Sequence, residues 1–336
     1  MEELRQYFRE DRDELPAGCI SCSNEEHKGI PSFRQNIEKL TTSKDVDTAN
    51  PSLTLLGLDI GFTCNMSCYM CSADVSSAFA AEYKALNWQT KSKITDADYS
   101  DVLLTIPKST RSIGYVNGEF FLDKTGNDVL SIVADRNIEL TITTNSSYIT
   151  DKHIDKLKNI NKNISVSLDG VDDLYPIMRY PISWQTFNSV FEKIVSMPNI
   201  QSIMLKMVIQ NLNVFDMINV MKFGYQHNIS TRVTLVHSNP WLMFDALDDA
   251  DRNNAIAMLT SQLDIERIRM TSMHVSNVEE YIQLLKNTVH DPVLNNQLVS
   301  KLAKIWKHRN LDYSYYQNIY PTLYRKIVDH NEQIKI

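Results

Sequence analysis

The sequence predicts an α/β fold in which six parallel strands alternate with helices as a partial, TIM-like (β/α)6 barrel. Short runs rich in Ile, Val, Leu and Thr recur along the middle of the chain, and helical stretches separate them. Several of these stretches open with Thr, Ser or Asp, the residue types that begin helices. Because strand–helix–strand connections within one sheet are right-handed, such a series winds into a parallel sheet.

The six predicted strands are short and apolar, as strands buried in a parallel sheet are. They cover residues 53–60, 112–116, 139–143, 164–168, 203–209 and 232–236. The predicted helices between them cover residues 96–104, 128–135, 151–157, 184–195 and 214–227. In a barrel of this kind the active site lies at the C-terminal ends of the strands.

Three segments make up the chain. Residues 1–50 are polar and form an N-terminal extension with short predicted helices at 2–9 and 32–40, and Asn50-Pro51 marks its end. Residues 51–240 are the barrel core, and residues 241–336 are predicted as a helical C-terminal region that covers an edge or an end of the barrel.

Composition excludes several classes of protein. Hydrophobic residues make up 43% and charged residues 22%, as in an ordinary soluble globular protein. Residues 203–225, the most apolar region, are interrupted by Lys206, Gln210 and Asp216, so no membrane span is expected. The charged N-terminus lacks the apolar core of a secretory signal, which predicts a cytoplasmic location. A formal net charge of −7 argues against binding of a nucleic-acid backbone, although not against a single nucleotide as substrate.

The five cysteines are clustered rather than spread. An odd number of cysteines in a chain without an export signal favours metal binding over disulfides. Cys64, Cys68 and Cys71 follow the first predicted strand with the spacing C-x3-C-x2-C. Three thiolates on one loop bind three irons of a cubane cluster and leave the fourth iron open to a small molecule. The alternatives are three buried structural cysteines or a zinc site, but no Cys or His follows closely enough to complete a zinc site.

This motif resembles the C-x3-C-x-Φ-C hallmark of radical S-adenosylmethionine (SAM) enzymes, and the resemblance covers residues 52–240. It implies a [4Fe–4S] cluster at the three cysteines, with the amino and carboxylate groups of SAM on the open iron. It also implies that one electron breaks a carbon–sulfur bond of SAM, and that the resulting 5′-deoxyadenosyl radical abstracts a hydrogen atom from the substrate. The apolar position Φ is Met70, which the resemblance places near the adenine.

The end of the second strand carries a further part of the resemblance. Residues Asn117, Gly118, Glu119 and Phe120 resemble the Gly-Gly-Glu-Pro segment of the family, in which the backbone and the Glu bind the amino group of SAM. The sequence departs from that segment at Asn117 and Phe120, while the carboxylate that faces an ammonium group is retained. The alternative is an ordinary turn with a solvated Glu.

The third and fourth strands also end in polar residues. Thr144 and Asn145 resemble the Thr-Asn-Gly of the family, whose short side chains bond ligand heteroatoms, although a helix cap is an equal alternative. Ser167, followed by Asp169-Gly170 and Arg179, resembles the Ser-Φ-Asp-Gly…Arg pattern. The resemblance places Ser167 near the ribose and Arg179 on the SAM carboxylate, which the planar guanidinium binds through two hydrogen bonds.

Cys19 and Cys22 form a C-x2-C pair, a generic half-site for zinc or an Fe–S cluster. The surrounding segment resembles one found in phage-type and bacterial radical SAM proteins with a SPASM or twitch auxiliary-cluster domain. Those proteins complete the extra cluster with further cysteines, which this sequence lacks. The extension is therefore interpreted as a remnant or half of such a segment. Two alternatives are a metal site completed by His27 or a carboxylate, and a pair that binds no metal.

The leading hypothesis is a radical SAM oxidoreductase that modifies a peptide or protein, by analogy with the SPASM and twitch families. Such an enzyme needs an electron donor such as flavodoxin or ferredoxin. A second hypothesis keeps the chemistry and takes a nucleotide, nucleoside or small metabolite as the substrate. A third is a non-catalytic Fe–S or metal-binding scaffold or partner subunit, which the departures at Asn117 and Phe120 favour.

Overall fold

The computed structural model describes residues 53–59, 61–88, 103–236 and 239–333, together with Ile20, Ser23, Glu26 and Gln35. The chain divides into two compact units, Met1–Leu53 and Thr54–Ile336. Cys19 and Cys22, the predicted helices at 2–9 and 32–40, and most of the predicted helix at 96–104 lie outside the described residues. The barrel core and the C-terminal helices belong to the same unit.

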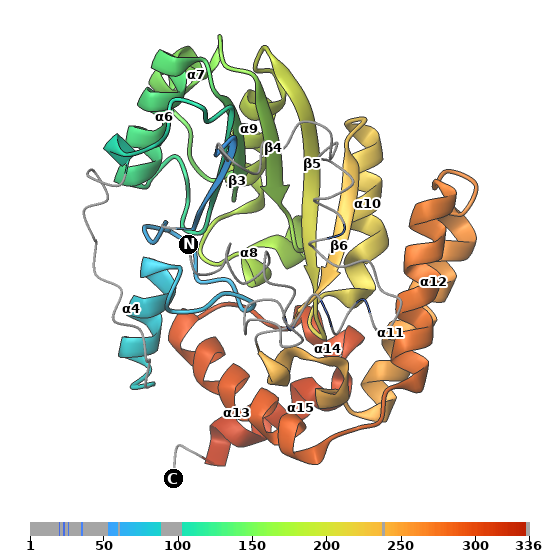
Figure 1. Ribbon diagram of the computed structural model, residues 1–336. Coiled ribbons are helices and arrows are strands. Elements are labelled where there is room, and N and C mark those ends of the chain that lie inside the picture. The colour runs from blue at the N-terminus through green and yellow to red at the C-terminus, as the bar shows by residue number, and fades with distance from the viewer. Residues whose placement is uncertain are drawn as a thin grey trace. The chain divides into compact units, whose positions relative to one another are not determined.

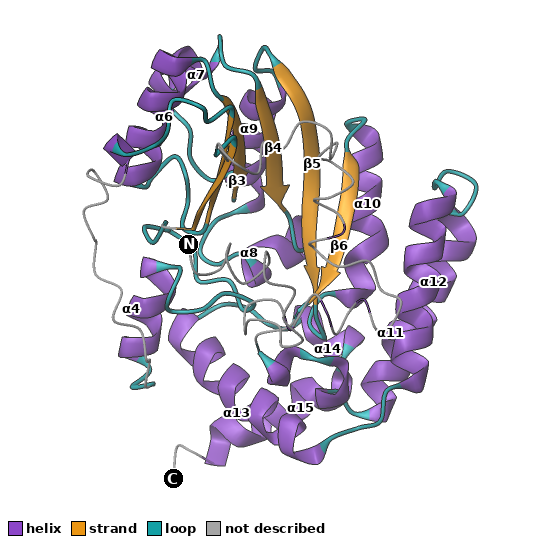
Figure 2. Ribbon diagram, in the orientation of Figure 1, coloured by secondary structure: helices purple, strands orange, loops and turns teal. Residues whose placement is uncertain are grey.

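A single six-stranded sheet forms the centre of the second unit (Figure 2). Every strand pairs in parallel with the next one along the chain, in the order β1-β2-β3-β4-β5-β6. The predicted partial barrel is therefore confirmed. Its strands are β1 Leu55–Asp59, β2 Ser112–Val116, β3 Glu139–Thr144, β4 Lys162–Ser167, β5 Ile200–Ile209 and β6 Ser230–Leu235.

The helices that connect the strands begin where the sequence offers a cap. The Asp123, Thr150 and Ser183 side chains each accept a backbone hydrogen bond at the start of a helix. The helices of this part are α4 Ser77–Ala85, α6 Lys124–Arg136, α7 Asp151–Leu157, α8 Tyr175–Met178, α9 Trp184–Val195 and α10 Met217–Gln226. Helices α7 and α9 match their predicted ranges, while α4 and α8 were not predicted.

Strands β4, β5 and β6 begin two or three residues earlier than predicted, and polar residues lie at or next to each of the three starts. Strand β4 begins at Lys162, which is fully buried. Its Nζ donates to the carbonyl oxygens of Leu157, Ile160 and Pro198 at 2.9, 3.0 and 2.6 Å, so the ammonium is satisfied inside the fold. Strand β5 likewise begins with a polar stretch, at Ile200 rather than at residue 203.

The C-terminal region is helical, as predicted, and lies at the end of the sheet where β5 and β6 terminate (Figure 1). It comprises α11 Asp249–Glu266, α12 Ser272–Asn287, α13 Pro292–Arg309, α14 Tyr315–Ile319 and α15 Pro321–Gln333. The Tyr316 hydroxyl donates to the carbonyl oxygen of Leu212, just after β5, at 2.8 Å. No helix among the described residues is long and apolar enough to cross a membrane.

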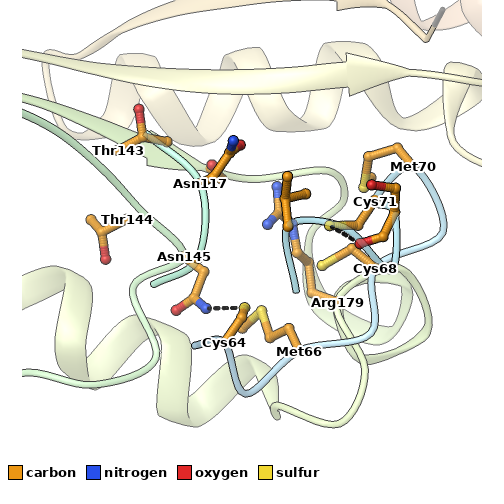
Figure 3. A pocket seen from close by; sticks show the side chains of 14 residues that line it. Cys64, Met66, Cys68, Met70, Cys71, Asn117, Thr143, Thr144, Asn145 and Arg179 are labelled. Carbon is orange, nitrogen blue, oxygen red and sulfur yellow. Dashed lines mark hydrogen bonds between the residues drawn. The ribbon is translucent and has the colours of Figure 1, made fainter. Parts of the chain in front are cut away.

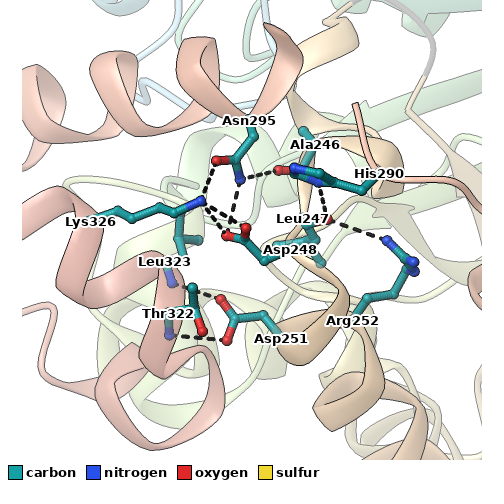
Figure 4. A network of polar contacts seen from close by, with 10 residues as sticks. All are labelled: Ala246, Leu247, Asp248, Asp251, Arg252, His290, Asn295, Thr322, Leu323 and Lys326. Atoms are coloured by element: carbon teal, nitrogen blue, oxygen red, sulfur yellow. Dashed lines mark hydrogen bonds and ion pairs between the residues drawn. The ribbon is translucent and has the colours of Figure 1, made fainter. Parts of the chain in front are cut away.

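A polar network connects the C-terminal helices (Figure 4). Lys326 of α15 donates to Asp248 at 2.7 Å and to Asn295 of α13 at 2.8 Å. Asp251 accepts the backbone N–H groups of Thr322 and Leu323 at 3.1 and 2.7 Å, and so satisfies the start of α15. These contacts hold α11, α13 and α15 together next to the C-terminal ends of the strands.

Candidate active site

The three motif cysteines lie on the loop between β1 and α4 and line one cavity of about 350 Å³ (Figure 3). Cys68 is buried, and Cys64 and Cys71 are half-buried. The predicted residues that line the same cavity come from four strand ends or loops: Met70, Gly118, Thr144, Asn145, Ser167 and Arg179. The parallel sheet brings these residues together because all of its strands end on the same side.

The cysteine loop is held by hydrogen bonds to its backbone. Asp123, the N-cap of α6, accepts the N–H groups of Phe62 and Thr63 at 3.1 and 3.0 Å. Ser77 Oγ accepts from the N–H of Cys64 and donates to its carbonyl oxygen, each at 3.0 Å. Sequence reasoning missed both residues. Asp123 as an N-cap is a local signal that could have indicated the start of α6. No local signal could have indicated that the Asp123 side chain contacts the cysteine loop.

The turn after β2 packs directly on this loop. Asn117 and Gly118 both have left-handed backbone, with φ of 68° and 59°. A Cβ on Gly118 would lie 3.0 Å from the backbone N of Phe62 and the backbone O of Thr63, so glycine is required here for space as well as conformation. The N–H of Glu119 donates to the carbonyl oxygen of Thr63 at 2.7 Å.

Glu119 is fully buried and lies behind the cavity wall rather than in it. Its carboxylate accepts the Thr144 hydroxyl at 2.7 Å, the Asn145 N–H at 2.6 Å and the Phe121 N–H at 3.4 Å. Burial raises the pKa of the Glu119 carboxyl to about 7, and these three donors oppose the rise. The carboxylate thus joins the ends of β2 and β3, and since a carboxylate has about four lone-pair positions, one remains for a further donor.

Asn145 faces the cysteines. Its side-chain amide lies 3.8 Å from Cys64 Sγ (Figure 3). The same amide donates to Asn65 Oδ1 at 3.1 Å. Asn65 in turn donates to Ser147 Oγ at 2.9 Å. The end of β3 is therefore bonded to the cysteine loop as well as to Glu119, which places the amide next to one thiol.

Ser167, at the end of β4, and Arg179, at the C-cap of α8, line the same cavity. Arg179 is 8% exposed and forms an ion pair with the buried carboxylate of Asp169. Asp169 also accepts the N–H of Val208 at 2.7 Å, so it has a defined position. The guanidinium Nε has no partner among the described residues, and a guanidinium has five N–H donors. Arg179 therefore has donors left for an anionic ligand in the cavity.

A residue far along the chain also contacts the cysteine loop. Arg309, at the C-terminus of α13, is 4% exposed and donates to both oxygens of Glu82 of α4, at 2.7 and 2.8 Å. It also donates to the carbonyl oxygen of Ser67, between the first two cysteines, and its guanidinium lies 4.7 Å from the ring centroids of both Tyr69 and Tyr180. Sequence reasoning missed Arg309, because no local pattern connects residues 242 positions apart.

The donor set fits an iron–sulfur cluster. Burial raises the pKa of the Cys64 thiol to about 11 and of the Cys71 thiol to about 12, and the neighbouring Cys68 adds to both shifts. Thiols in such an environment become thiolates when cations bind them. Among the described residues, no three His, Cys, Asp or Glu side chains lie close enough to hold a single metal ion. A zinc ion gathers its ligands around one centre, whereas a cubane binds each thiolate through a different iron. Three thiols that line one cavity therefore fit a cubane, whose fourth iron takes a small molecule in place of a protein ligand.

The comparisons with known proteins agree with this site. Residues 58–224 match the family model described as "Radical SAM superfamily". The chain therefore contains a radical SAM domain, the domain of enzymes that use a [4Fe–4S] cluster and SAM as cofactors. No curated protein sequence matches the chain significantly.

Several solved structures match the chain at low identity and with TM-scores below 0.5. Streptococcus suis SuiB bound to S-adenosylmethionine is 14% identical with a TM-score of 0.43, over 76% of this chain and 52% of SuiB. Native anSMEcpe with bound AdoMet is 13% identical with a TM-score of 0.43, over 64% of this chain and 60% of anSMEcpe. TYW1 with a lysine-pyruvate adduct bound is 12% identical with a TM-score of 0.35, over 61% of this chain and 70% of TYW1. The matches thus span about half of SuiB and three-fifths of anSMEcpe.

Proposed function

We propose that this chain cleaves SAM reductively at Cys64, Cys68 and Cys71 and uses the 5′-deoxyadenosyl radical to modify a peptide or protein. The observation that carries the proposal is one cavity in which the three cysteines meet Arg179, Ser167 and Asn145. A cluster held by the three cysteines would supply one electron for cleavage of the sulfonium of SAM. Arg179 binds the SAM carboxylate, Ser167 donates to the ribose, and Met70 shields the adenine from water. Glu119 orients Asn145 from behind the cavity wall through its contact with the Asn145 N–H.

The choice of a peptide or protein substrate is an analogy with the SPASM and twitch families. Structures of SuiB and anSMEcpe include bound peptides. For this chain the support is the segment around Cys19 and Cys22, which resembles one found in some radical SAM proteins with a SPASM or twitch domain, families of which many modify peptides. A nucleotide, nucleoside or small metabolite is the second candidate. In either case a one-electron donor such as flavodoxin or ferredoxin is required.

Anaerobic incubation with SAM and dithionite tests the proposal, because 5′-deoxyadenosine forms only when the site is functional. We expect the parent protein to release 5′-deoxyadenosine, and a true substrate to increase the amount and to change in mass. A fully loaded protein that binds SAM and releases no 5′-deoxyadenosine would instead identify a non-catalytic scaffold.

Arg179→Lys should weaken SAM binding by about 10- to 100-fold, since a charge-assisted contact contributes roughly 1.5–3 kcal/mol and lysine lacks the planar fork. Lysine keeps a cation beside the buried Asp169, so the fold and the iron content should persist. Calorimetric titration with SAM measures the effect. Arg232→Lys, at an exposed position of β6, is the matched control. Parent-like affinity in Arg179→Lys would remove Arg179 from the SAM site.

The N-terminal pair leads to a prediction about metal content. We propose that residues 1–50 are an incomplete auxiliary-cluster segment, because a second cubane needs about four cysteine ligands and the chain has only Cys19 and Cys22 beyond the motif. Parent and Cys19→Ala/Cys22→Ala should both contain about four irons per chain. About eight irons in the parent, falling to about four in the double variant, would show a complete second cluster. Zinc in the parent alone would show a zinc site instead.

A further inference from the structure

A second cavity, of about 480 Å³, lies between Trp88 and one side of α13. It shares no lining residue with the cavity at the cysteines. Lys301 and Lys304 line it, and Val293 at its rim is 65% exposed. This cavity is called the α13 groove below.

The charge of α13 is unusual for this chain. The helix contains Lys301, Lys304, Lys307 and Arg309 and no Asp or Glu, although the whole chain has a formal net charge of −7. Arg309 is buried against Glu82, whereas Lys304 and Lys307 are exposed and form no ion pair with any described residue. Since residues three apart on a helix are neighbours, the two lysines extend the positive charge of the groove along the helix surface.

Aromatic rings connect the groove with the cysteine loop. The Lys301 ammonium lies 4.4 Å from the ring centroid of Trp88 and 5.6 Å from that of Trp241. Trp241 packs edge-on against Tyr69, with 6.4 Å between ring centroids. Tyr69 directly follows Cys68, and Asn239 donates to the carbonyl oxygens of Tyr69 and Cys71 at 3.2 and 3.4 Å. Lys301, which lines the groove, is thus connected through Trp241 to the loop that carries the three thiols.

We propose that the α13 groove is the docking surface for an acidic one-electron carrier protein. The proposal rests on the proposed function, which requires one electron for each SAM cleaved. The reduced carrier loses one electron and the cluster site gains one, with no proton or group transferred. Electron transfer needs only a short separation from the cysteine loop, which the contact of Trp241 with Tyr69 provides.

The position of the groove favours a carrier over an acidic substrate. A substrate has to reach the cavity where the radical forms, and the α13 groove has no wall in common with that cavity. A carrier does not have to enter it. Complementary charge across an exposed interface accelerates association and sets the partner's orientation, which suits a complex that forms and dissociates at each electron transfer.

Reversal of two exposed charges tests the proposal on the cluster-loaded protein. Flavodoxin, an acidic flavin protein, is titrated calorimetrically into the parent, into Lys304→Glu/Lys307→Glu, and into Lys193→Glu/Lys286→Glu. The last variant has the same net charge, with both changes on exposed positions of α9 and α12. We expect the α13 variant to bind flavodoxin at least about 10-fold more weakly at low salt and the control to bind like the parent.

Production of 5′-deoxyadenosine gives the second readout. In the α13 variant the flavodoxin-driven rate should fall at subsaturating flavodoxin, while the dithionite-driven rate, which needs no docking, should stay at the parent level. Parent-like flavodoxin binding in the α13 variant would overturn the docking proposal. It would also be overturned if the α13 variant lost affinity for an acidic substrate and kept its affinity for flavodoxin. No dithionite-driven product in the parent would overturn the proposed function alone, because the binding comparison decides the docking surface independently.

Discussion

Replacement of Cys64, Cys68 and Cys71 by alanine should abolish both the cluster and all SAM cleavage. Thiolates are the iron ligands that this loop offers. The three cysteines would hold the cluster, each through a different iron. After anaerobic reconstitution the parent should be brown with about four irons at this site, and the triple variant colourless. With no cluster to pass an electron to SAM, 5′-deoxyadenosine should fall to the background of a reaction without enzyme.

The fold should survive this change, because the loop is held by Asp123, Ser77 and Arg309 through backbone groups rather than by the thiols. Far-ultraviolet circular dichroism of the triple variant should therefore match that of the parent without its cluster. The matched control is Cys19→Ala/Cys22→Ala, which removes two cysteines and should keep the brown colour. A triple variant that still holds a full cubane would refute the assignment of the three ligands.

Arg309→Met should destabilise the protein by about 3–5 kcal/mol, the usual cost of removing one partner from a buried ion pair. The change leaves the Glu82 carboxylate, which is 5% exposed, without a counter-ion, and the carbonyl oxygen of Ser67 without its donor. Urea unfolding of the protein without its cluster measures the free energy of unfolding. Arg325→Met, at an exposed position of α15, should change it by less than about 0.5 kcal/mol.

A double-mutant cycle separates the ion pair from the contact with the cysteine loop. Glu82→Gln combined with Arg309→Met should cost less than the sum of the single changes, since the double variant buries no unpaired charge. Iron retention during dialysis gives an independent readout. Arg309→Met should lose its cluster faster than Arg325→Met, because the carbonyl between Cys64 and Cys68 is no longer held. Additive free energies together with parent-like iron retention would show that Arg309 is not coupled to the loop.

The fold was predictable to within a few residues wherever apolar periodicity and helix caps coincide. Strand β2 and helices α7 and α9 have the predicted bounds, and in α7 and α9 the caps Thr150 and Ser183 occur exactly one residue before the first helical turn. The start of β4 was missed because Lys162 is charged, and only the three carbonyl groups that surround its ammonium make that burial favourable. Helix α8, four residues long, is too short to show a period.

The sequence by itself was enough to name most of the residues that line the candidate site. The spacing of Cys64, Cys68 and Cys71 puts them on one loop, and the polar residues that follow the next strands all reach the same end of a parallel sheet. Only the tertiary structure decided which of these groups face the cavity and which support it. Glu119 turned out to lie behind the wall, and Arg179 to be paired with Asp169. Arg309 reaches the loop from α13, and Lys301 joins the α13 groove to Trp241. Periodicity and spacing report contacts within a few residues along the chain, whereas these contacts depend on how separate helices and strand ends pack against one another.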